Sequence, residues 1–314
     1  MAKIMVKLLV LVFAFIVFSV SGFILYSGLF QKTHLASYID KIRRLESIQN
    51  IQKAVFIGGS ASHFGIQAEL FEKETAVPSV NMGLYADGSF KMYMDNVLPY
   101  LGDGDAVFLC PEYEYYSSGF DKISDGSIDL VYMSGAAVFK NTSMFYKIKA
   151  APETLISGWR HLGNIIKYHA AASADKNYKN VFLGDYRRDY SDAYGDYKGI
   201  KNIPNKSFEK RHFVVYDDRM FLSELDKYAG NLVKNNIGVY LLFPPGTGFL
   251  FEISALEIEK IYSAVLLLKN ITPLFHPGDV LYTDDNFFDT FYHLNYDAAI
   301  QYTRYIISRY KEVK

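Results

Sequence analysis

A long uncharged segment near the N-terminus limits what this chain can become more than any other feature. From Leu8 to Phe30 no side chain is charged, and as a helix this segment would span roughly 34 Å at about 1.5 Å per residue. That length exceeds the hydrocarbon thickness of a bilayer, which is about 30 Å. The sequence therefore predicts that residues 1–33 consist of a short cytoplasmic tip followed by a transmembrane anchor.

Two lysines set the expected orientation of this anchor. Lys3 and Lys7 precede the apolar segment, and basic residues favour the cytoplasmic side of a membrane. We therefore expect a single-pass protein of the cell membrane with residues 31–314 outside the cytoplasm, in the periplasm or the extracellular space. The competing interpretation is a cleaved signal peptide with small residues around Gly22. The apolar run continues past Gly22, which favours a retained anchor, and both interpretations place the rest of the chain outside.

Composition narrows the possible function classes. The chain has 33 basic and 34 acidic residues, so it has no basic excess to neutralise phosphates, and nucleic acid is not an expected partner. Its single cysteine, Cys110, excludes an internal disulfide and thiolate zinc clusters. Cys110 lies in an apolar run and is expected to be a buried small hydrophobe and not a nucleophile. The histidines show no metal-ligand spacing, so we expect no metal and no other cofactor.

Strand and helix patterns alternate along most of the chain after a predicted helical stalk at residues 34–52. Short β-rich runs are found at residues 54–57, 77–82, 106–110 and 238–243 and, more weakly, near 273–275. Helical patterns lie between them, and a last helix is expected to begin at Asn295. This alternation predicts an α/β domain over residues 53–314, a three-layer α/β/α sandwich with a mainly parallel, flavodoxin-like sheet.

The alternation is interrupted over residues 114–211. We expect this stretch to form a mostly helical insertion over the strand ends. It includes a polar loop with four tyrosines, namely Tyr186, Tyr190, Tyr194 and Tyr197. These rings either pack the loop or stack on sugar rings of a ligand.

The residues that directly follow the predicted strands carry the chemistry. In an open parallel α/β sheet, ligands bind beyond the carboxyl ends of the strands. The segments expected there are Gly58-Gly59-Ser60, Asn81-Met82-Gly83, Pro111-Glu112-Tyr113, Phe243-Pro244-Pro245, and Asp289 with His293. Together they offer a nucleophile, a base, a carboxylate to orient the base, and glycines that can expose backbone N–H groups. These are the parts that acyl transfer requires.

Several of these residues also have an ordinary structural interpretation. Ser60 follows two glycines at a strand-to-helix turn, where a helix N-terminus can stabilise a developing oxyanion. A helix N-cap is the alternative role for such a serine, and the nearby Ser62 is the better candidate for the cap. His63 could line the site, but its position is more typical of a surface residue. Asp289 lies four residues before His293, close enough to hold its imidazole.

These motifs resemble the SGNH, or GDSL-like, hydrolase superfamily. Residues 56–60 resemble its first block, residues 81–84 its second and residues 289–295 its last. The similarity covers about residues 53–113 and 213–312. It is to the membrane-anchored branch that includes the D-alanine transfer protein of teichoic acid operons and the alginate O-acetylation proteins.

The resemblance implies roles for particular residues. Ser60 would be the nucleophile, His293 the base and Asp289 its partner, with the N–H groups of Ser60 and Gly83 in the oxyanion hole. Two features depart from the family pattern. The third block usually supplies an asparagine, where this chain has Pro111-Glu112-Tyr113, and the Asp-to-His spacing is four instead of three.

The same resemblance implies a function on the cell surface. We expect a serine esterase or O-acyltransferase that acts on acyl esters, above all acetyl esters, of a cell-surface polysaccharide. Glu112, Tyr113 and Pro244 are expected to contact this substrate, and a multi-pass membrane O-acyltransferase is an expected partner. The alternative is a non-catalytic SGNH-fold partner or glycan-binding subunit of such a system, which the missing asparagine favours. The presence of serine, histidine and aspartate at separate strand ends favours the enzyme, and hydrolase and transferase both remain open.

Overall fold

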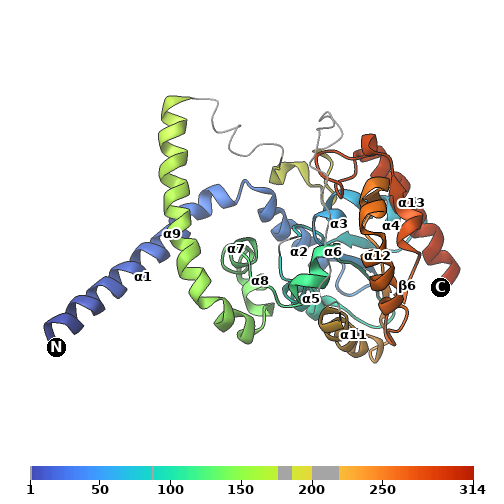
Figure 1. The fold of residues 1–314 in the computed structure, drawn as a ribbon, viewed down its shortest axis with the longest axis horizontal. Helices are drawn as coiled ribbons and strands as arrows, with labels where there is room; N and C mark the ends of the chain where they lie inside the picture. The colour runs from blue at the N-terminus through green and yellow to red at the C-terminus, as the bar shows by residue number, and fades with distance from the viewer. Residues whose placement is uncertain (1, 87, 176–185, 200–218) are drawn as a thin grey trace.

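A computed structural model of the protein describes residues 2–86, 88–175, 186–199 and 219–314, and Figure 1 shows how they are arranged. A five-stranded sheet is surrounded by helices, and one long apolar helix extends from the N-terminal end of this body. The N-terminus and the C-terminus lie at opposite ends of the molecule (Figure 1). The chain is thus an α/β protein, as the sequence pattern predicts.

The central sheet is built from five short strands. They are β1 Ala54–Gly58, β2 Ser79–Asn81, β3 Ala106–Cys110, β4 Gly238–Leu241 and β6 Thr272–Pro273. Their order is β2-β1-β3-β4-β6, and every neighbouring pair is parallel. All residues of β1 and β3 are buried, as is typical of central strands in a parallel sheet. A separate parallel pair joins β5 Gly246–Thr247 to β7 Leu281–Tyr282.

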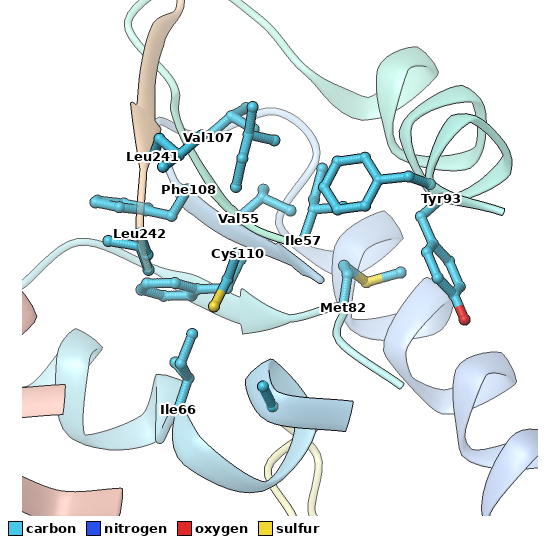
Figure 2. Close-up of a cluster of buried hydrophobic side chains, with 14 of the residues drawn as sticks. Val55, Ile57, Ile66, Met82, Tyr93, Val107, Phe108, Cys110, Leu241 and Leu242 are labelled. Atoms are coloured by element: carbon cyan, nitrogen blue, oxygen red, sulfur yellow. The ribbon is translucent and has the colours of Figure 1, made fainter. Parts of the chain in front are cut away.

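The main core lies where these strands meet the surrounding helices. Figure 2 shows Val55, Phe108 and Leu241, from three neighbouring strands, in one cluster. Phe56 and Phe108 are partners in the register of β1 and β3, and their rings stack with centroids 4.7 Å apart. Cys110 is fully buried in the same core, which confirms its expected role as a small hydrophobe.

Helices surround the sheet, and several of them begin after a residue whose side chain caps the first turn. The helices around the sheet include α3 Ser60–Gly65, α4 Ala68–Thr75, α5 Phe90–Val97, η2 Leu98–Tyr100, α11 Arg219–Val233, α12 Gly248–Val265, η5 Pro277–Val280, η6 Asp284–Asn286 and α13 Tyr296–Val313. At the start of α13, the side chain of Asn295 accepts a hydrogen bond of 3.0 Å from the N–H of Ala298. The expected start of the last helix at Asn295 is thereby confirmed.

The segment expected to be a stalk joins the main core. Residues 34–52 contain η1 His34–Ala36 and α2 Ser37–Ser47. Tyr38, Lys41 and Leu45 are fully buried, and their spacing of three and four residues places them on one face of α2. Because this face is covered by the sheet domain, α2 is packed into the domain and does not stand clear of it.

The connection between β3 and β4 is mostly helical. It contains α6 Tyr113–Ser118, α7 Asp125–Met133, α8 Ala136–Asn141, α9 Met144–Ala174 and η3 Arg188–Tyr190. Residues 176–185 and 200–211 of the expected insertion lie outside the described residues. The helix α9 crosses the N-terminal helix and lies away from the sheet, so it does not cover the strand ends as expected (Figure 1). Residues 186–199 do reach the strand ends, since the N–H of Asn81 donates to the carbonyl of Tyr194 at 2.9 Å.

The N-terminal helix α1, Ala2–Phe30, is the one helix among the described residues that is long and apolar enough to cross a membrane. It packs closely against α9 where Gly22 meets Gly158. A Cβ atom added at either glycine would overlap backbone atoms of the other helix, so the two backbones touch directly. On the N-terminal side of this crossing, the ring of Phe15 stacks on Trp159 with centroids 5.7 Å apart.

Candidate active site

Ser60 lies at the carboxyl end of β1, at the first residue of α3. Its hydroxyl donates a hydrogen bond of 3.2 Å to Oε1 of Glu112, and the residue is 9% exposed. Gly59 precedes it and approaches the Glu112 carboxyl group so closely that a Cβ atom would overlap the carboxyl oxygens. The glycine therefore lets the serine and the carboxyl group come together.

Neither nearby serine caps α3, so that expectation is wrong. The N-cap position is Gly59, and no side chain accepts a capping hydrogen bond there. Ser62 lies inside the helix, fully buried, with its hydroxyl 3.4 Å from Oδ1 of Asn81. The N-cap lies three residues earlier than a capping serine at position 62 would require.

Glu112 is a fully buried carboxyl group beside the candidate nucleophile. Its Oε1 also accepts a hydrogen bond of 2.6 Å from the N–H of Ala61, while Oε2 is buried without a hydrogen-bond partner. Burial raises the pKa of Glu112 to about 7, against the N–H of Ala61, which lowers it. Near neutral pH, this group therefore exchanges between a carboxylate and a neutral acid.

Asp289 and His293 form a hydrogen-bonded pair in the loop before α13. His293 Nδ1 lies 2.7 Å from Asp289 Oδ1, and the hydroxyl of Tyr186 donates to Asp289 Oδ2. The turn between them is held by Thr290, whose Oγ1 accepts a hydrogen bond of 3.2 Å from the N–H of His293. The spacing of four residues thus brings carboxylate and imidazole into contact, as the sequence predicts.

Phe64 brings this pair to the helix that carries Ser60. Its ring lies against the imidazole of His293, with centroids 4.2 Å apart. Phe64 follows Ser60 by four residues in α3, so the two side chains lie on the same face of the helix. Phe64 also belongs to a small buried cluster with Tyr197 and Phe288. For Tyr197, loop packing is therefore the observed role.

The expected oxyanion donor Gly83 is engaged within the protein. Its N–H donates a hydrogen bond of 2.9 Å to Oδ1 of Asn81. The amide of Asn81 in turn donates to the carbonyls of Ser62 and Ile66, both at 2.9 Å. Gly83 is therefore held next to α3, as an oxyanion hole requires, but its N–H would have to leave Asn81 to bind a ligand.

The sequence patterns did not reveal the buried polar cluster formed by Lys41 and His63. The Nζ of Lys41 donates to the carbonyls of Asn81 and Gly195 at 2.7 and 2.6 Å, and it lies 3.2 Å from Nδ1 of His63. His63 is fully buried, so the expectation of a surface residue is wrong. Lys41 could have been found from its position on the apolar face of α2, between Tyr38 and Leu45.

The residues expected to contact substrate are covered in this structure. Tyr113 is 3% exposed, Pro244 is buried and Glu112 is fully buried. The ring of Tyr113 lies 6.3 Å from that of Tyr292, which directly precedes His293. In the described part of the chain, no three His, Cys, Asp or Glu side chains gather as metal ligands.

A scan against models of known protein families matches none of them, and a search of curated proteins returns no match. A function for this chain is therefore inferred from the geometry of the residues around Ser60 and His293.

Proposed function

We propose that this protein is an SGNH-type serine esterase or O-acyltransferase, with Ser60 as nucleophile, His293 as base and Asp289 as the partner of the base. The observation that carries the proposal is the Asp289–His293 hydrogen bond of 2.7 Å, held by Phe64 against the helix that begins at Ser60. An aspartate on Nδ1 leaves Nε2 of the imidazole as the atom that accepts a proton from the nucleophile.

In the proposed reaction these residues act in turn. Ser60 Oγ attacks the ester carbonyl carbon while its proton passes to Nε2 of His293. The N–H of Ser60 at the start of α3 donates to the developing oxyanion, with the N–H of Gly83 as the second donor once it leaves Asn81. The carbon–oxygen bond of the ester then breaks, and the leaving alcohol takes the proton from His293. Water or a sugar hydroxyl next attacks the acyl-Ser60 and returns the serine hydroxyl.

Two other histidines, His34 and His63, lie near His293. Burial, and to a smaller extent His293 itself, lowers the pKa of His34 to about 4. Burial and the nearby Lys41 hold the pKa of His63 well below its ordinary value. Both neighbouring histidines are thus neutral at pH 7, so neither opposes the formation of the imidazolium.

The wider setting of the site supports a cell-envelope role. The strand order places the first strand in chain order between the second and the third, which is the order of flavodoxin-like, doubly wound sheets with sites at the carboxyl strand ends. We assign α1 as a membrane anchor with Lys3 and Lys7 on the cytoplasmic side, so the site faces the periplasm or the extracellular space. The substrate would be an acylated glycan of the cell surface, and a multi-pass membrane O-acyltransferase a partner.

Covalent labelling tests the nucleophile. The full-length protein in detergent is treated with a fluorophosphonate probe and assayed with p-nitrophenyl acetate, with and without an oligosaccharide acceptor. Ser60→Ala and His293→Ala should lose both labelling and turnover. Ser62→Ala is the matched control, because Ser62 lies in the same helix two residues on, and it should retain both. Labelling that persists in Ser60→Ala would move the nucleophile elsewhere, and an acylated oligosaccharide would identify a transferase.

A non-catalytic partner of a membrane O-acyltransferase is the second candidate. Two observations favour it: the hydroxyl of Ser60 is held by Glu112, and the N–H of Gly83 is held by Asn81. If cells with Ser60→Ala acylate their surface glycan as well as wild-type cells, and the purified protein neither turns over ester nor takes the probe, this candidate replaces the enzyme.

A further inference from the structure

The long helix α9 carries an apolar face that the described part of the chain leaves exposed. Phe145, Ile148, Ile156, Trp159 and Ile166 are between 41% and 68% exposed. Their spacings of three, eight, three and seven residues place them in one stripe along the helix. We call these five residues the α9 outer face. Contiguous exposed apolar side chains of this kind are typical of an interaction surface, whereas single scattered ones are common on any helix.

A second face of α9 is the one that packs on the protein. It consists of Tyr146, Ala150, Ser157, His161 and Tyr168, all of which are buried. Nε2 of His161 lies 2.7 Å from Oδ1 of Asp129 in α7, which fixes the rotation of α9 about its own axis. The α9 outer face is therefore held away from the domain by contacts on a different side of the helix.

The α9 outer face is continuous with the apolar surface of α1. Trp159 packs on Phe15 and Phe18, with ring centroids 5.7 and 5.5 Å apart. The side chains of α1 on this N-terminal part are mostly exposed and apolar. Figure 1 shows the two helices crossing. The environment that surrounds the apolar side chains of α1 therefore also surrounds α9 at Trp159.

The position of the crossing fits the boundary of a bilayer. From Lys7, the last charged residue before the apolar segment, to Gly22, α1 rises about 22 Å, and the hydrocarbon of a bilayer is about 30 Å thick. With Lys7 at the cytoplasmic surface, the contact between Gly22 and Gly158 lies about 8 Å below the opposite surface. Trp159 directly follows Gly158 and packs on Phe15 and Phe18, so its ring lies on the membrane-core side of the crossing. Interfacial helices insert their apolar face by about 5–10 Å.

The charges of α9 agree with a helix that lies along the surface. Lys149 donates to Asp121 at 2.7 Å and Arg160 pairs with Asp125, so basic side chains follow the border between the outer face and the protein face. Among the described helices only α1 qualifies as a membrane span, so α9 is too polar to cross. A helix with Trp and Phe on one face and Lys and Arg beside it is typical of interfacial binding.

We propose that the α9 outer face docks on the acyl-chain boundary of the outer leaflet of the bilayer that α1 crosses. This inference rests on the proposed membrane anchoring and is independent of the proposed chemistry. The contacts of α9 with α1 and the docked α9 outer face would together fix the height and the tilt of the domain relative to the membrane. A single transmembrane helix would leave both free.

The docked arrangement places the candidate site just above the membrane. α1 rises about 12 Å from Gly22 to its end at Phe30. Shortly after this end, the ring of His34 lies 5.4 Å from that of Tyr186, whose hydroxyl donates to Asp289. A substrate would therefore be reached close to the lipid surface, as suits a lipid-linked or nascent polymer.

Site-directed labelling in lipid nanodiscs tests the docking. Single cysteines are introduced at Ile148→Cys and Ile166→Cys and labelled with an environment-sensitive fluorophore. The native Cys110 is fully buried and does not compete. Glu153→Cys and Asn164→Cys, exposed positions off the outer face, are matched controls, and Val12→Cys reports on α1. In phosphatidylcholine and phosphatidylglycerol nanodiscs, labels at 148 and 166 should shift to the blue and lose fluorescence to brominated acyl chains, and labels at 153 and 164 should do neither.

The only tryptophan of the chain, Trp159, gives an unlabelled readout. Its emission should be quenched more by bromines near the carbonyl end of the acyl chains than by bromines near their ends. Labels at 148 and 166 that behave like those at 153 and 164, with the label at 12 in lipid, would overturn the docking and leave the anchor standing. A label at 12 in water would overturn the anchor itself. Protection at 148 and 166 in native membranes but not in nanodiscs would replace lipid by a protein partner.

Discussion

Replacing Glu112 with glutamine should remove a specific pH dependence of stability. Burial raises the pKa of Glu112 from 4.5 to about 7 in the folded protein. A carboxyl group whose pKa is higher in the folded state contributes its full stability below the unfolded pKa, and this contribution is lost as the pH rises through the folded pKa. The window for this group is therefore pH 4.5 to about 7. At about 1.4 kcal/mol per unit, the loss across it amounts to about 3 kcal/mol.

Glutamine keeps the shape of the side chain and cannot titrate. Its carbonyl oxygen can still accept from Ser60 and Ala61. Urea unfolding of the full-length protein in detergent, followed by near-ultraviolet circular dichroism, gives the free energy of unfolding of both proteins from pH 4.5 to 8. The difference, wild type minus Glu112→Gln, should fall by about 3 kcal/mol between pH 4.5 and 7 and then level off. Two curves that run parallel over the whole range would show that Glu112 is ionised throughout and that the argument from burial is wrong.

Three further substitutions follow from single contacts. Lys41→Met leaves the carbonyls of Asn81 and Gly195 without their hydrogen-bond donor, so the free energy of unfolding should fall by about 2–5 kcal/mol. Residues 186–199 should also be cleaved sooner by protease, and an unchanged free energy of unfolding would contradict this expectation. Ala76→Gly should raise the free energy of unfolding by about 1 kcal/mol, because the exposed Ala76 ends α4 in the left-handed region with a φ of 59°. A lower free energy of unfolding in urea for this variant would show that the position is not strained. Asp289→Asn should lower kcat for p-nitrophenyl acetate by up to about 10⁴-fold without changing the circular dichroism spectrum, and activity near that of wild type would count against the triad.

Local patterns were sufficient for the parts of the fold that depend on local sequence. The strands at Ala54–Gly58 and Ala106–Cys110 could be predicted because each is a short apolar run followed by turn residues. The Asp289–His293 contact could be predicted because only one turn separates the two residues. Contacts between distant segments were beyond reach. Nothing near Ser60 shows that its hydroxyl meets Glu112, 52 residues further along the chain.

Two other features could not be predicted from the sequence, namely the buried polar groups and the path of the insertion. Lys41 is paired with a carbonyl 154 residues away, and without that partner a lysine reads as a surface residue. His63 is misjudged for the same reason, because its partner Lys41 lies 22 residues away in the sequence. The path of α9 along α1 depends on the contact between Gly22 and Gly158, which neither segment reveals alone.

The strand order also dictates the sequence of events while the chain is being synthesised. β3 is a central strand, but its partner β4 begins only at Gly238, after the whole helical connection. Until that residue has emerged, β3 has one edge of unpaired N–H and C=O groups along a fully apolar strand. The nascent protein therefore passes through a long period in which this edge can pair with another chain, and assembly of the sheet is slow because its last partner is so remote.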